Sequence, residues 1–166
     1  MTNDHFMQEA LKEAKKAFNK NEAPIGAVAV LDGKVIARAH NLKENKNDPL
    51  GHAEILLLHK VSKKIKRWRL TGITVYVTLE PCLMCIGALI QSRVDRLVFG
   101  TLDPKAGACG SLYDLSKDSR LNHHIEVTSG ILQKECSEIL KGFFKNLRRG
   151  RDSNPRYPYG YTSFRD

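Results

Sequence analysis

The sequence lacks any apolar run long enough to cross a membrane, since a spanning helix needs about 18 or more consecutive apolar residues. Its first residues, Met1 to His5, also lack the cationic start and the apolar stretch of a secretory signal. No internal repeat and no linker divides the first 150 residues. We therefore expect one domain of ordinary size, in the cytoplasm, with no membrane partner.

Cysteine is scarce, with four residues in the whole chain: Cys82, Cys85, Cys109 and Cys136. Two disulfides are not expected, because the chain has no export signal and the cytosol keeps thiols reduced. The spacing Cys82-x-x-Cys85 indicates a metal or redox site instead. Cys136 lies among apolar residues at helical spacing, so we expect it in the core.

Acidic residues are also scarce, at 18 against 27 basic residues, which gives a formal net charge of +9. Residues 141–166 contain seven basic and two acidic residues. A second cluster contains no acid and comprises Lys60, Lys63, Lys64, Lys66, Arg67 and Arg69. Such clusters suit a polyanion, because lysine and arginine side chains that bind phosphates release the counterions held there. Solvated lysine faces have the same composition, so charge alone leaves both interpretations open.

Hydrophobic spacing predicts an α/β domain. Apolar residues three and four apart predict an amphipathic helix over residues 4–20. Asp32-Gly33 predicts a hairpin between strands at 25–31 and 34–39. The later elements are a polar loop at 41–51, a helix from Ala53, a strand at 73–79, a helix at 82–91, a strand at 94–100, a loop at 103–111, a strand at 125–128 and a helix at 131–147. A hairpin followed by β-α-β alternation predicts a mixed sheet between helices.

Two segments have a residue pattern that differs from that of an ordinary amphipathic element. The helix at 82–91 is apolar nearly all round, which predicts burial on more than one side and hence a homodimer. From Gly150 onward the chain has no helical or strand period. We therefore divide the chain into a domain at 1–149 and an irregular basic tail at 150–166.

Three candidate metal ligands are predicted at the starts of two helices. His52 precedes one helix, and Cys82 and Cys85 open another directly after a strand and Pro81. One imidazole and two thiolates leave the fourth tetrahedral zinc position for water, which is typical of catalytic sites. Zinc lowers the pKa of bound water from 15.7 to about 7, so hydroxide becomes available at neutral pH. Glu54 is then placed to take the proton from that water and return it to a substrate.

Two other interpretations use the same residues. Cys82-x-x-Cys85 after a strand also matches a thioredoxin-like redox motif. A structural zinc site would need a fourth ligand, and His59, His123, His124 and Cys109 lack convincing spacing to the pair. Neither alternative requires the His-x-Glu pair, so the joint occurrence favours catalysis.

The combination His52-x-Glu54, then 26 residues, then Pro81-Cys82-x-x-Cys85 resembles the cytidine-deaminase-like zinc hydrolases. The likeness extends to the bacterial tRNA-specific adenosine deaminases over roughly residues 5–147. The further matching segments are Pro24 to Val28, Asn41, Asp48-Pro49, Thr78 to Cys82, Val98 to Gly100 and Asp103 to Gly107. Residues 150–166 match nothing typical of that family.

This resemblance implies a three-layer α/β/α domain with a five-stranded mixed sheet, and one Zn²⁺ per subunit of a homodimer. It implies hydrolysis of a cyclic amidine: adenosine in tRNA becomes inosine at the wobble position, by a zinc-bound hydroxide with Glu54 as proton shuttle. Asn41 would contact the target nucleoside, and Asp103 and Lys105 would border the RNA groove. From charge, Arg148 and Arg149 of the last helix are also expected to contact tRNA.

Three rival functions remain open at this point, and one of them is the thiol redox protein described above, which an oxidised, metal-free Cys82–Cys85 pair would favour. A deaminase of a free base or nucleoside (guanine, cytosine or cytidine) would share the metal site without needing the basic clusters. A zinc-stabilised RNA-binding module without activity would share the charge, but it would have no use for Glu54 beside the metal.

Overall fold

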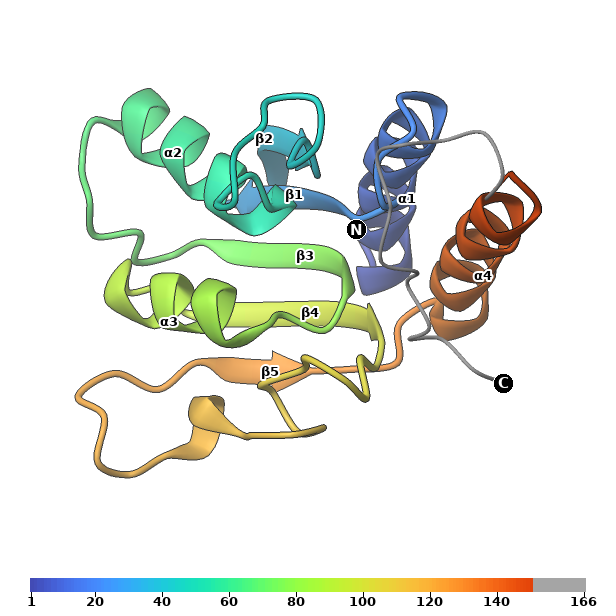
Figure 1. The fold of residues 1–166 in the computed structure, drawn as a ribbon. Helices are drawn as coiled ribbons and strands as arrows, with labels where there is room; N and C mark the ends of the chain where they lie inside the picture. Colours follow the sequence, from blue (N-terminus) through green and yellow to red (C-terminus); the bar gives the residue numbers. More distant parts are fainter. Residues whose placement is uncertain (151–166) are drawn as a thin grey trace.

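The computed structural model describes residues 1–150 of the 166-residue chain, and the predicted tail from 151 onward lies outside the described residues. A five-stranded sheet in the order β2-β1-β3-β4-β5 forms its centre (Figure 1). The elements are α1 (Asn3–Asn19), β1 (Gly26–Leu31), β2 (Lys34–His40), α2 (Ala53–Ile65), β3 (Thr74–Leu79), α3 (Leu83–Gln91), β4 (Arg96–Thr101), the 3₁₀ helix η1 (Leu115–Lys117), β5 (Glu126–Thr128) and α4 (Gln133–Arg149). No helix of the described part is long and apolar enough to cross a membrane.

The sheet is mixed, as the sequence predicts. β1 pairs antiparallel with both β2 and β3, whereas β3, β4 and β5 run parallel. Asp32 and Gly33, with φ of 49° and 72°, form the predicted hairpin turn between β1 and β2. Positive φ at both central residues matches the right-handed twist of the flanking strands.

The two faces of the sheet carry different helix pairs, which gives the three predicted layers. On one face, Ala27, Val75 and Phe99 belong to a core shared with α2 and α3. On the other face, Val28 and Tyr76 pack with residues of α1 and α4. The alternation follows from the pleat, because successive side chains of a strand point to opposite faces.

Helix α1 lies directly on the sheet because Gly26 has no side chain. A Cβ at this position would overlap the backbone of Ala10 and Ala14. Ala10, Ala14 and Ala17 are fully buried, so small residues on both elements permit the close approach. This contact fixes the start of β1 against α1.

Strand β2 forms one edge of the sheet, and lysines from α2 cover part of it. Lys60 Nζ donates to the Arg38 carbonyl at 2.7 Å, and Lys64 Nζ donates to the Ile36 carbonyl at 2.9 Å. Two members of the basic cluster at residues 60–69 therefore bind backbone carbonyls of this chain.

Three details differ from the sequence prediction. Helix α4 begins at Gln133, after Leu132 adopts a left-handed conformation with φ of 50°. Helix α3 begins at Leu83, one residue later than predicted, with Cys82 as its N-cap. The short helix η1 has no periodic signal and was not expected.

Candidate metal centre and active site

The candidate metal ligands lie where α2 and α3 begin. His52 is the N-cap residue of α2 and Cys82 is the N-cap residue of α3, and both have extended backbone conformations. Neither side chain caps its own helix, so both can turn toward a shared centre. The pattern His-x-Glu and the pattern Cys-x-x-Cys thus meet at one edge of the sheet, as predicted from the two helix starts.

The distances between the ligand atoms fit a tetrahedral zinc ion. His52 Nδ1 lies 3.4 Å from Cys85 Sγ and 3.6 Å from Cys82 Sγ. With zinc bonds of about 2.05 Å to nitrogen and 2.3 Å to sulfur, tetrahedral ligand atoms lie about 3.6 Å apart. The three atoms form the only such group of three or more candidate ligands among residues 1–150. His123 and His124 instead hydrogen-bond to backbone carbonyls, so neither serves as a fourth ligand.

The local electrostatics favour a thiolate at this point. The pKa of Cys82 is lowered to about 4, chiefly by a hydrogen bond from the Cys85 thiol and also by His52. The pKa of Cys85 is raised, because its proton is held against Cys82 and because the thiol is buried. Cys82 also stands at a helix N-terminus, where the partial positive charge stabilises a thiolate. A bound cation would take the place of the shared protons.

Glu54 lies beside this group without belonging to it. It is the second residue of α2, the residue is 4% exposed, and its pKa is raised chiefly by burial. A carboxyl group whose pKa moves toward neutrality can both accept and release a proton at physiological pH. Glu54 thus lies next to the three candidate ligands, and its role as the acid–base group stays a prediction.

A pocket of about 330 Å³ opens over the three side chains His52, Glu54 and Cys82. We call the part of the lining at the metal group its inner end. The rest of the lining, which we call its outer end, comes from loops, from the last residue of β3 and from α4; the residues there are Ala23, Ile25, Asn41, Lys43, Leu79, Glu80, Asp103, Lys105, Ala106, Leu140 and Phe144.

Three of the five predicted substrate-binding residues line this pocket. Asn41 is buried, and its side chain is oriented because Oδ1 accepts from the Lys43 amide at 3.1 Å. Asp103 accepts from the Lys105 amide at 3.1 Å, and burial raises its pKa. Lys105 lies on the same wall.

The other two, Arg148 and Arg149, lie outside the pocket lining. Both are exposed in the last turn of α4, one turn or more beyond Phe144. Contact with tRNA at these residues stays a prediction.

Sequence reasoning did not assign Lys43, Glu80, Leu140 or Phe144 to the pocket. Lys43 stands two residues after Asn41 and Glu80 stands two residues before Cys82, so proximity to predicted residues was an available signal. Leu140 and Phe144 gave none, because only the packing of α4 across the end of the sheet brings them to the site.

A His-Cys-Cys group at two helix starts, with a glutamate beside it, is typical of the zinc-dependent base deaminases. The fold and the site define this class. Comparison with known proteins then gives the family: the model of the MafB19-like deaminases matches residues 1–148, and the chain belongs to this family.

Its similarity to curated proteins is high over most of its length. It is 52% identical to the tRNA-specific adenosine deaminase of Bacillus subtilis strain 168 over 150 residues, covering 90% of this chain and 93% of that protein. It is 47% identical to the tRNA-specific adenosine deaminase of Haemophilus influenzae over 146 residues, covering 87% and 84% of the two chains.

Solved structures agree. A structure from a study of A-to-I editing by tRNA:A34 deaminases at the wobble position of transfer RNA superposes with a TM-score of 0.79. It is 44% identical and covers 82% of this chain and 99% of that chain. A guanine deaminase from Nitrosomonas europaea, at 22% identity and a TM-score of 0.71, shares the fold alone.

Proposed function

We propose that this protein hydrolyses adenosine to inosine in tRNA, at the wobble position of the anticodon. The observation that carries the proposal is the His52, Cys82 and Cys85 group with Glu54 beside it, in a pocket of a chain 52% identical to a tRNA-specific adenosine deaminase. Because tRNA is its proposed substrate, we infer that the protein works in the cytoplasm.

The donor set suits zinc, with His52, Cys82 and Cys85 as three ligands to one ion per subunit. When bound there, zinc would supply a nucleophile at neutral pH by lowering the pKa of water to about 7. Glu54 lines the same pocket beside these ligands.

Glu54 moves the protons of the reaction. The attacking water loses a proton to the Glu54 carboxylate as its oxygen bonds to C6 of adenine, and Glu54 gives that proton to N1. The new hydroxyl at C6 then loses its proton by way of Glu54 to the amino group, which leaves as ammonia. The products are inosine, with a C6 carbonyl and a proton on N1, and ammonia. The burial that raises the pKa of Glu54 suits both directions of transfer.

The rest of the pocket binds and orients one nucleotide. Asn41 would present an amide to the nucleoside, and Lys43 and Lys105 place positive charge on two different loops of the lining, where phosphates would pass. A base inside a duplex cannot enter such a site without leaving its stack, which costs a few kcal/mol. An anticodon loop offers an unstacked base at lower cost.

The direct test is to incubate the purified protein with total tRNA and to measure inosine by nucleoside mass spectrometry. We expect inosine to form in tRNA and little to form from free adenosine, because remote phosphate contacts help to position the base. The matched substrates are guanine, cytosine and cytidine. Efficient turnover of one of them, with none on tRNA, would replace this proposal by the free-base or nucleoside deaminase.

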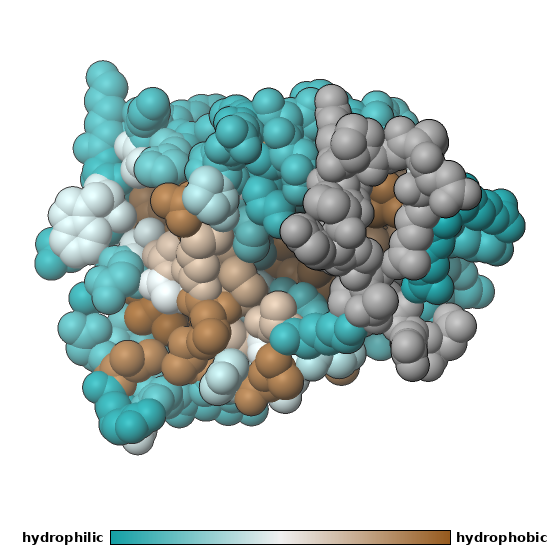
Figure 2. Space-filling view, in the orientation of Figure 1, coloured by the Kyte–Doolittle hydropathy of each residue, from teal (hydrophilic) through white to brown (hydrophobic). Residues whose placement is uncertain are grey.

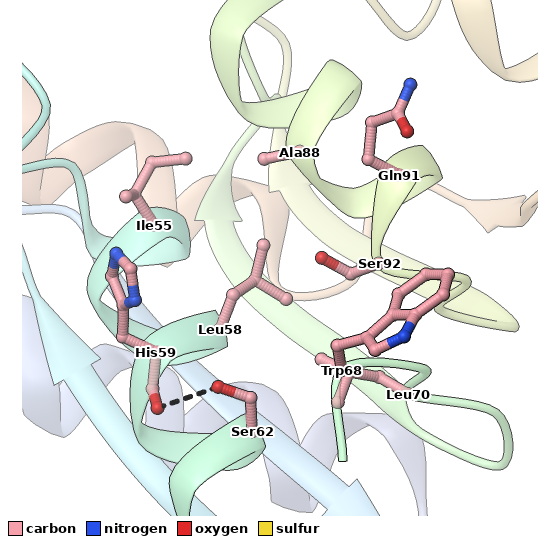
Figure 3. A pocket seen from close by; sticks show the side chains of 9 residues that line it. All are labelled: Ile55, Leu58, His59, Ser62, Trp68, Leu70, Ala88, Gln91 and Ser92. Atoms are coloured by element: carbon pink, nitrogen blue, oxygen red, sulfur yellow. Dashed lines mark hydrogen bonds between the residues drawn. The ribbon is translucent and has the colours of Figure 1, made fainter.

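The protein is further proposed to act as a homodimer through the face formed by α2 and α3. A groove of about 470 Å³ runs between these helices, and Figure 3 shows Ile55 and Leu58 of α2 facing Ala88 of α3. At its end, Trp68 is 57% exposed. Figure 2 shows apolar side chains gathered over α3 and beside it. An apolar surface of this kind marks an interaction site, and a second copy fits the predicted symmetric dimer.

Light scattering at micromolar concentration tests this assembly. The wild-type protein should have twice the mass of one chain, and Ala88→Arg should have the mass of one chain, because a cation there would be buried in the interface. Gln8→Arg, on the exposed side of α1, is the matched control and should leave the dimer intact. A wild-type monomer would contradict the proposal.

A further inference from the structure

Glu80 is a buried carboxylate with no assigned role in the reaction. It lies between β3 and Cys82, and its residue is 2% exposed. Among the described residues, no lysine, arginine or histidine forms a salt bridge with it. A buried charge needs compensation by other means, since removing it from water is otherwise very unfavourable.

The compensation comes from one loop. Glu80 Oε2 accepts from the Asp103 amide at 2.9 Å and from the Ser111 hydroxyl at 2.5 Å. Glu80 Oε1 accepts from the amides of Cys109 and Ser111 at 3.1 and 3.0 Å. Both oxygens are thus taken up by donors from residues 103–111. Hydrogen bonds to a charged acceptor are about twice as strong as those between neutral groups.

That loop forms one wall of the pocket and is tied to a metal ligand. Asp103, Lys105 and Ala106 line the pocket, and Gly107 forms an isolated bridge with Cys82. A Cβ at Gly107 would overlap the Glu80 carboxylate, so the loop passes directly over it. The wall is therefore fixed to the metal group at two points: the backbone at Cys82 and the side chain of Glu80.

We propose that Glu80 is a positioning residue that sets the distance between the 103–111 wall and the metal group, and thereby the orientation of the bound nucleotide. It neither ligates the metal nor transfers protons, because its oxygens are engaged by the loop. The catalytic test of this role rests on the proposed deaminase function, whereas the structural test does not.

Glu22 provides a matched control on the opposite wall. It is fully buried, and it accepts from the Asn45 amide and side chain and from the Glu44 amide. It thus holds the loop that carries Asn41 and Lys43. The two carboxylates have the same kind of environment but contact different loops, so a specific effect and a general loss of stability can be distinguished.

The structural test is hydrogen exchange followed by mass spectrometry on the full-length, zinc-loaded protein. In Glu80→Gln, one oxygen becomes a donor that opposes the loop amides, so peptides within 102–112 should exchange about tenfold faster or more. Peptides within 41–48 should be unchanged, and Glu22→Gln should give the reverse pattern. Unchanged exchange at 102–112, or equal acceleration of both loops in Glu80→Gln, would overturn the proposal.

The catalytic test compares tRNA with an isolated anticodon stem-loop. Glu80→Gln should retain its zinc, and kcat/KM should fall about tenfold to 100-fold on both substrates, because small misplacements in a pocket have effects of this size. Loss of zinc, or a loss on tRNA alone, would contradict the assignment. Ser111→Ala removes one donor and should give a smaller change of the same kind even if Glu80→Gln does not fold. An inactive wild-type protein would count against the deaminase function, while the exchange result would still decide the role of Glu80.

Discussion

The inner and outer ends of the pocket are built in different ways. At the inner end, His52, Glu54, Cys82 and Cys85 stand at the first residues of two helices, where strand and helix packing fix the backbone. At the outer end, the lining comes from the loops around Asn41 and Asp103 and from one face of α4. The residues of the inner end can be identified by their type and spacing in the sequence. The residues of the outer end come together only because separate segments lie close in space.

The largest expected effect is the loss of zinc from the inner end when one of its three ligands is removed. Cys82→Ala should lose nearly all of about one zinc per chain, together with deaminase activity and some thermal stability, because two ligands hold zinc poorly. Metal content by atomic absorption measures this. Cys136→Ala is the control, since Cys136 packs in the core away from the metal group. A Cys82→Ala protein with full zinc and activity would show that the inner end is assigned wrongly.

The next largest effect separates metal binding from proton transfer at the inner end. Glu54→Gln should retain zinc and fold but reduce kcat by about 10²–10⁴-fold, because the amide cannot accept and return a proton. Single-turnover kinetics on tRNA give the rate of deamination, and metal analysis of the same sample gives its zinc content. A reduction of less than tenfold would mean that another group is the main proton shuttle.

The smallest effect concerns the outer end and its extension along α4. Reversing the charge of Arg148 and Arg149 to Glu should raise KM for tRNA several-fold and lower the salt slope of binding by about two units, one for each phosphate contact. Turnover of short oligonucleotides should stay the same. Lys134→Glu, in the first turn of α4, is the control. An unchanged slope would mean that Arg148 and Arg149 do not contact tRNA phosphates, and that the outer end does not extend beyond the rim of the pocket.

The same contrast explains what could be predicted from the sequence. The strands, the Asp32-Gly33 hairpin, the mixed sheet and the helix pairs follow from period and turn chemistry, and the structure confirms them. The metal group was predictable because helix starts place short motifs in known directions. Phe144 and the contacts of Glu80 were not, because they depend on how α4 and a loop without periodicity pack across the sheet. The start of α4 was placed too early, because a left-handed Leu132 is not encoded by propensity.

The basic cluster at residues 60–69, in α2 and just after it, shows that charge cannot be interpreted without geometry. All six of its cations are exposed, which suits the predicted contact with a polyanion. Two of them, however, already hydrogen-bond to the backbone of β2. Composition alone cannot separate these two uses of a lysine.

These lysine contacts also bear on whether the sheet can grow by pairing with another molecule. An exposed edge strand offers unpaired carbonyls and amides to strands of other chains and is a common start of aggregation. Along β2, Lys60 and Lys64 occupy two of those carbonyls and place positive charge where an incoming strand would have to lie. At the opposite edge, β5 has only three residues and offers little length for pairing. The sheet is thereby protected from pairing at both edges, by charge at β2 and by shortness at β5.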